Sequence, residues 1–158
     1  MKKAALFIMA VLSGMNLFSQ REYLPTPEDL EHFYKTKTYI VLQDNPISEY
    51  NFEITDAVKK FWTITPYEFI NFDDFEKKAN DPNASFLYTA AVSFEKDKTQ
   101  TRYTFLCLSL GGDYEALDQL KDIANIPLAY FGVDEDAYSY KLGTLVHFMQ
   151  NHVKLITE

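Results

Sequence analysis

TYIVLQDNPISEYNFEITDAVKKFW, residues 38–62, is the stretch on which the predicted fold depends. Its first six residues are β-rich and apolar almost throughout, which predicts a strand covered on both faces. The apolar side chains then recur at helical spacing with charged residues on the other side, which predicts an amphipathic helix beginning near Ile47 or Ser48. In open α/β folds, ligands usually bind where a strand passes into a helix in this way.

The sequence on either side of this stretch predicts two short helices and three more strands. Thr26 and Asn71 suit the N-cap positions of the helices, because their side chains can accept hydrogen bonds from first-turn amides. The β-rich runs are residues 63–70, 86–95 and 101–110. The polar link KDKTQ between the last two runs predicts an antiparallel hairpin.

The last third of the chain is predicted to be largely helical. The glycine pair 111–112 is expected to end the hairpin, and Asp113 to cap a helix that Pro127 stops. Residues 128–133 are expected to form a short edge strand or an apolar loop. Residues 134–156 carry apolar side chains at helical spacing and predict a terminal helix.

Strands that alternate with helices imply a parallel pair joined by a right-handed crossover, to which the hairpin adds antiparallel strands. The expected fold class is therefore α/β, a three-layer mixed sheet with helices on both faces. No internal repeat or low-complexity tract interrupts it.

The element order over residues 38–125 resembles that of thioredoxin-like and glutaredoxin-like domains. Those families place their redox cysteines in the loop after the first strand, which here reads QDNPISEYN and contains none. Without a thiolate pair there is no dithiol exchange of that kind, so the resemblance implies the fold and not the redox activity. This interpretation also requires a central first strand and a cis Pro82.

Residues 1–20 have the layout of a secretory signal peptide. Two lysines precede the unbroken apolar run of residues 4–12, and cleavage is expected just after Ser19 or Gln20. A membrane span needs about 20 apolar residues, so this run is short for one, and an uncleaved anchor is the alternative. No cysteine lies near the cleavage region, so no lipoprotein anchor is expected.

The expected organisation follows from this leader. Residues 1–20 are the signal peptide, residues 21–37 a lead with a short helix, and residues 38–158 a single α/β domain. No later segment is apolar enough to span a bilayer. The expected localisation is periplasmic or secreted.

Charge and cysteine content exclude several classes of function. Removing residues 1–20 takes away two lysines and no acids, which moves the formal net charge from −8 to −10. An acidic domain repels phosphate backbones, so nucleic acid is not an expected partner. Cys107 is the only cysteine and lies in an apolar run, so we expect a buried, unreactive thiol. No CxxC, HExxH or GxSxG motif occurs, and no metal or cofactor is expected.

Asp44, Asn45 and Glu49 are the candidate catalytic residues. They follow the first strand, and paired carboxylates can act as acid and base when their surroundings separate their pKa values. On this hypothesis the protein is a small hydrolase or ligand-binding enzyme. The alternative, which we favour, is that Asp44, Asn45 and Pro46 form an ordinary turn between strand and helix.

Aromatic residues are the other unusual feature, at 16% of the chain. Tyrosine is common at interfaces because it combines a large apolar area with a polar tip. The densest aromatic region that is expected to face outward lies in residues 129–140. Its candidate binding residues are Tyr130, Phe131, Tyr138 and Tyr140. The alternative is that they pack against the sheet.

The segments YIVLQDNPISEYN and KKFWTITPYEFI resemble uncharacterised exported α/β domains of Gram-negative cell envelopes. That resemblance implies no activity. The leading hypothesis is an exported, non-catalytic domain that binds a protein or an envelope component, and the enzyme with an acidic site after the first strand is the alternative.

Overall fold

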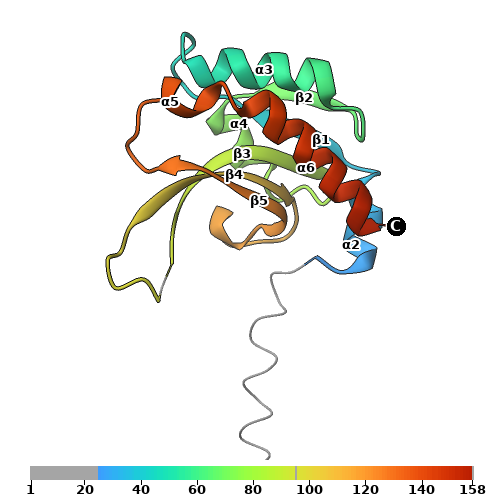
Figure 1. The fold of residues 1–158 in the computed structure, drawn as a ribbon. Coiled ribbons are helices and arrows are strands. Elements are labelled where there is room, and N and C mark those ends of the chain that lie inside the picture. Colours follow the sequence, from blue (N-terminus) through green and yellow to red (C-terminus); the bar gives the residue numbers. More distant parts are fainter. Residues whose placement is uncertain (1–24, 95, 158) are drawn as a thin grey trace, which may run out of the picture.

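The computed structural model describes residues 25–94 and 96–157, which form a five-stranded sheet with helices on both faces (Figure 1). The predicted signal peptide, residues 1–20, lies outside the described residues. The strands are β1 (Lys37–Val41), β2 (Tyr67–Ile70), β3 (Ala84–Ser93), β4 (Arg102–Leu110) and β5 (Lys121–Tyr130). Their order across the sheet is β2-β1-β3-β4-β5.

The sheet is mixed, as predicted. β1 runs parallel to both β2 and β3, whereas β3, β4 and β5 are antiparallel neighbours. Each parallel connection contains a helix, α3 (Glu49–Phe61) between β1 and β2 and α4 (Phe72–Lys78) between β2 and β3. The predicted α/β class is therefore confirmed.

One face of the sheet, which we call the main face, carries most of the core. Four helices cover it: α2 (Pro27–Phe33), α3, α5 (Asp136–Ser139) and α6 (Leu142–Thr157) (Figure 1). Ile40, Leu87 and Leu106 project from the strands into the same apolar cluster as Ile54 and Val146 from the helices, and all five are fully buried. Burial of side chains of this kind contributes about 1.5 to 3 kcal/mol each.

The opposite face, which we call the α4 face, has a smaller core. Phe75 of α4 packs on Phe86 with ring centroids 4.8 Å apart and on Tyr88 with centroids 5.0 Å apart. Val41 and Leu120 belong to the same apolar cluster. Because α3 and α4 lie on opposite faces, the loops that follow the neighbouring strands β1 and β2 leave the sheet toward opposite sides. Open α/β sheets form a crevice at such a point, at the carboxyl ends of the strands.

The helix N-caps follow the sequence. Thr26 Oγ1 accepts from the Asp29 amide at 3.2 Å, and Asn71 Oδ1 accepts from the Asp74 amide at 2.8 Å. Ser48 caps α3, which begins at Glu49, one or two residues after the predicted start. These caps satisfy amides that have no partner within the helix.

The prediction of a helix from Asp113 to Pro127 is wrong. Only a short 3-10 turn forms there, η1 (Leu117–Gln119), and Lys121–Tyr130 is the edge strand β5. Lys121 pairs with Leu110 and Tyr130 with Tyr103. For residues 128–133, the expected edge strand is present at residues 128–130 as the end of β5, and residues 131–132 form a turn. Pairing with β4 overrides the local helical spacing, and Pro127 is tolerated because an edge strand leaves some amides unpaired.

Two other elements are shorter than predicted. The strand expected over residues 63–70 begins at Tyr67, because the preceding residues form a turn in which Trp62 Nε1 donates to Thr65 Oγ1 at 2.9 Å. The terminal helix is divided into α5 and α6, and between them the Lys141 amide donates to the Tyr138 carbonyl at 3.0 Å.

The element order departs from the thioredoxin-like pattern after the hairpin, where a strand replaces the expected helix. β1 lies inside the sheet, between β2 and β3, but the peptide bond before Pro82 is trans. Within the described part of the chain, none of the helices is both long and apolar enough to cross a membrane.

Candidate functional site

The loop after β1 is held by the side chain of Asn51, in the first turn of α3. Asn51 Nδ2 donates to the carbonyl oxygens of Gln43 and Asn45, both at 2.9 Å, and Asn51 Oδ1 accepts from the Gln43 amide at 2.9 Å. Asn51 is only 8% exposed, so these hydrogen bonds are shielded from water. The backbone of residues 43–45 is therefore fixed relative to α3.

A second contact joins this region to the segment before α5. Glu135 Oε2 accepts hydrogen bonds from Ser48 Oγ at 2.6 Å and from the Tyr50 amide at 3.3 Å. A carboxylate at a helix N-terminus is favoured by the helix dipole and by the unpaired amides there. The site is thus built from segments 87 residues apart in the sequence.

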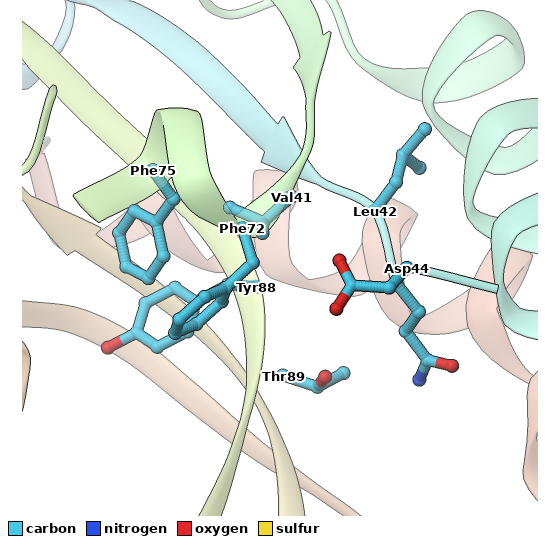
Figure 2. Close-up of a pocket in the computed structure, with 8 residues that line it drawn as sticks. Val41, Leu42, Asp44, Phe72, Phe75, Tyr88 and Thr89 are labelled. Atoms are coloured by element: carbon cyan, nitrogen blue, oxygen red, sulfur yellow. The ribbon is translucent and has the colours of Figure 1, made fainter. Parts of the chain in front are cut away.

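Three hollows meet at Gln43, which lines all of them. The first, which we call the aromatic hollow, has a volume of about 130 Å³ (Figure 2). Figure 2 shows Phe72, Phe75 and Tyr88 on one side of it and the carboxylate of Asp44 pointing toward it from the other. Its lining residues are Val41, Leu42, Gln43, Asp44, Phe72, Phe75, Tyr88 and Thr89.

The second hollow, which we call the edge groove, has a volume of about 680 Å³. It runs along α3 as far as Lys59 and is bounded on the other side by the start of α4 and by the loop after β1. Its lining residues are Leu42, Gln43, Asp44, Pro46, Asn51, Phe52, Thr55, Asp56, Lys59, Asn71 and Asp73. Three aspartates and one lysine give this groove a net negative charge. Phe52, at 58% exposure, presents an aromatic ring to solvent beside these charges.

The third hollow, of about 310 Å³, lies between the ends of β3 and β4 and the segment that follows β5. Phe131 and Tyr138 line it together with Gln43, Thr89 and Glu135. Tyr138 is only 5% exposed. Burial and the nearby Glu135 carboxylate raise the pKa of its hydroxyl, although a hydrogen bond with Gln43 opposes them, so Tyr138 is neutral at physiological pH.

The structure separates the three candidate catalytic residues. Asp44 lines both the aromatic hollow and the edge groove. Asn45 Oδ1 accepts from the Ile47 amide at 3.3 Å, so this side chain forms part of the turn. Glu49 is the exposed first residue of α3, and it does not line any of the three described hollows.

The four aromatic candidates divide into two pairs. Phe131 and Tyr138 line the third hollow. Tyr130 and Tyr140 are 62% and 68% exposed, and the Tyr130 ring lies beside Tyr103 of β4, with centroids 5.3 Å apart. Tyr130, Phe131 and Tyr140 are thus exposed to solvent, whereas Tyr138 is buried.

The described residues include neither a reactive thiol nor a cluster of metal ligands. Burial raises the pKa of the Cys107 thiol to about 12, so the thiol is protonated at physiological pH, as its position in an apolar strand predicts. Among the described residues, no group of three or more histidine, cysteine, aspartate or glutamate side chains is placed to hold a metal ion. The arrangement is suited to binding by charge and apolar contact.

Several lining residues were not predicted from the sequence. Phe52 interrupts the polar side of α3, but a single exposed apolar residue is common on protein surfaces and is not a specific signal of a site. Asp73 and Phe72 lie at the start of α4, and only the strand order brings them next to Asp44. That order was not predictable from local patterns.

Comparisons of this chain with protein-family models, with curated proteins and with solved structures found no match.

Proposed function

We propose that this chain is an exported, non-catalytic α/β domain that binds a protein partner through the edge groove. The observation that carries the proposal is the groove itself, about 680 Å³ of space with apolar and acidic side chains at the carboxyl end of β1. Ligand sites of open α/β sheets are found at this position.

The chemistry of the groove favours a partner segment with positive and apolar side chains. Asp44, Asp56 and Asp73 outnumber Lys59, so a basic segment is attracted and an acidic one repelled. Phe52, which lines the groove, is 58% exposed, and Ile47, in the loop before α3, is 78% exposed. Burying them against apolar groups of a partner stabilises the complex by about 25 cal/mol per Å² of apolar surface before the costs of association.

The proposal that the domain is exported rests on residues 1–20, which have the layout of a signal peptide. An envelope or extracellular protein with a basic, partly apolar segment is then the class of partner. The resemblance of the first strand and helix to exported α/β domains supports the same location.

The alternative, a small hydrolase, has less support from the geometry. Of its three candidate residues only Asp44 lines a hollow, while Asn45 forms part of the turn and Glu49 lies in solvent. A general acid and a general base must both reach the reacting atoms.

Selection of random peptides displayed on phage against the purified protein tests the proposed function. We expect enrichment of peptides that combine lysine or arginine with apolar residues. Their binding should weaken at least about tenfold, or 1.4 kcal/mol, in Phe52→Ala and in the double variant Asp56→Asn, Asp73→Asn. Phe148→Ala is the matched control, because Phe148 is 59% exposed on α6.

Two results would count against the proposal. One is enrichment of peptides with no excess of positive charge. The other is equal binding of the enriched peptides to the groove variants and to the wild-type protein.

A further inference from the structure

We propose that the aromatic hollow binds an alkylammonium group, presented by a lysine side chain of the partner. This inference rests on the proposed function and specifies which chemical group of the partner is recognised. The observation behind it is a carboxylate, Asp44, that faces three aromatic rings across a small open hollow (Figure 2).

The aromatic rings form a wall that is favourable to a cation. Phe75 lies at the back of the wall, with its ring centroid 5.8 Å from that of Phe72 and 5.0 Å from that of Tyr88. The interplanar angles of 78° and 41° turn the rings relative to one another, so that they do not form a flat stack. The faces of aromatic rings are electrostatically negative and attract ammonium groups.

The opposite side of the hollow supplies oxygen atoms. Asp44 is exposed, and its carboxylate has no hydrogen-bond partner among the described residues, so it is available to a ligand. Gln43 and Thr89 add neutral polar groups. Among the eight described residues that line the hollow, none carries a positive charge that would compete for Asp44.

Size and position favour the end of a lysine side chain. The volume of about 130 Å³ is close to that of an engineered cavity of ~150 Å³ that binds benzene, so the hollow has room for an ammonium group and its nearest methylenes. The aromatic hollow shares Leu42, Gln43 and Asp44 with the edge groove. A segment lying in the groove can therefore place a side chain in the hollow.

The hollow also selects against an anion or a neutral group. A carboxylate placed next to Asp44 is repelled by the like charge. A neutral alkyl chain makes the apolar contacts but lacks the ion pair that an ammonium group forms with Asp44. Phe72 is 43% exposed, so its ring is accessible to a ligand before binding.

Titration of the ¹⁵N-labelled protein with n-butylammonium, followed by NMR, tests this inference, with 1-butanol as the neutral probe. We expect n-butylammonium to shift the amide signals of Phe72, Tyr88 and Thr89 and to bind at least fivefold more tightly than 1-butanol. Affinity should fall at least fivefold in Asp44→Asn and in Phe72→Leu, which keeps an apolar side chain but removes the ring. Asp118→Asn, on η1 outside the hollow, should bind like the wild type. Raising the salt concentration should weaken binding.

Equal affinity for the two probes, or unchanged affinity in both Asp44→Asn and Phe72→Leu, would overturn the inference. Its failure is distinguishable from failure of the proposed function. If peptides still require Phe52 while n-butylammonium does not bind, the edge groove is a binding site and the aromatic hollow is not. If n-butylammonium binds while no peptide does, the hollow is a site and the groove partner is not a peptide segment.

Discussion

Asn51 is the single residue that does most to fix the loop after β1. Its three hydrogen bonds to residues 43 and 45 are made by one side chain at 8% exposure. Buried polar groups that lose a partner retain the full cost of their desolvation. The position of Gln43 and Asp44, and with it the shape of all three hollows, therefore depends on Asn51.

Replacing Asn51 should destabilise the folded protein. In Asn51→Ala the Gln43 and Asn45 backbone groups lose their partners, and we expect the free energy of unfolding to fall by about 2 to 3 kcal/mol. Urea denaturation followed by circular dichroism measures this. Asn83→Ala, at an exposed turn, is the control and should change stability by less than about 0.5 kcal/mol. Equal effects of the two substitutions would show that Asn51 does not hold the loop.

Asp29 makes stability depend on pH. Its side chain is 23% exposed and accepts from Lys121 Nζ at 2.8 Å and from the Thr26 amide at 2.7 Å. Partial burial raises the pKa of the Asp29 carboxyl, but the Lys121 ammonium and the Thr26 donors outweigh it and hold the pKa below its ordinary value. A carboxyl whose pKa is depressed on folding stabilises the protein at pH values above its unfolded-state pKa of about 3.9. This stabilisation is lost as the pH falls through the folded-state pKa.

We therefore expect Asp29→Asn to reduce the free energy of unfolding by about 1 kcal/mol at pH 7, after allowance for partial solvent screening. The difference from the wild type should shrink below about pH 4 and vanish at lower pH. Urea denaturation at a series of pH values measures the difference, with the exposed Asp118→Asn as control. A difference that grows as the pH falls would contradict this assignment.

At the scale of elements, the end of β4 is packed unusually closely against the end of α4. The Gly111 amide donates to the Ala84 carbonyl at 2.9 Å, and the Gly112 amide to the Ala79 carbonyl at 3.0 Å. A Cβ atom on Gly111 would overlap the Asp81 carbonyl oxygen. This contact is with the backbone, so no side-chain rotation can relieve it.

Gly111→Ala should therefore force β4 and the turn after α4 apart, and we expect a loss of about 2 kcal/mol or more in the free energy of unfolding. Gly143→Ala is the matched control, because its Cβ would meet only Phe61 Cε2 at an ordinary 3.5 Å. In the helix α6 that change should stabilise by about 0.5 to 1 kcal/mol. Thermal denaturation of both variants measures the contrast, and a tolerated Gly111→Ala would show that the two elements are not so closely packed.

The sequence predicts elements well where local signals agree with tertiary pairing. The caps at Thr26 and Asn71, the strand before Asp44 and the amphipathic helix after Ser48 are all of this kind. The prediction of a helix over residues 113–127 fails because local signals and tertiary pairing disagree there. There the apolar spacing favours a helix, but β4 has a free edge, and pairing along Lys121–Tyr130 satisfies its backbone groups.

At the scale of the whole molecule, the strand order creates the candidate site. Placing β1 between β2 and β3 brings the start of α4 next to the loop after β1, so that Phe72 and Asp73 meet Asp44. Asp44 could be proposed from the sequence, because it follows a predicted strand. Its aromatic and acidic neighbours could not, because parallel strand order depends on contacts distant in the sequence.

The central claim is that a partner binds at the carboxyl end of β1. The most direct test is photo-crosslinking in intact cells of the native host, with a photoreactive phenylalanine analogue at Phe52 and, as control, at Phe148 of α6. Both positions are similarly exposed, at 58% and 59%. The account predicts one discrete protein adduct at Phe52, attached through a basic segment of the partner and absent at Phe148. An adduct at Phe148 with none at Phe52 would contradict it.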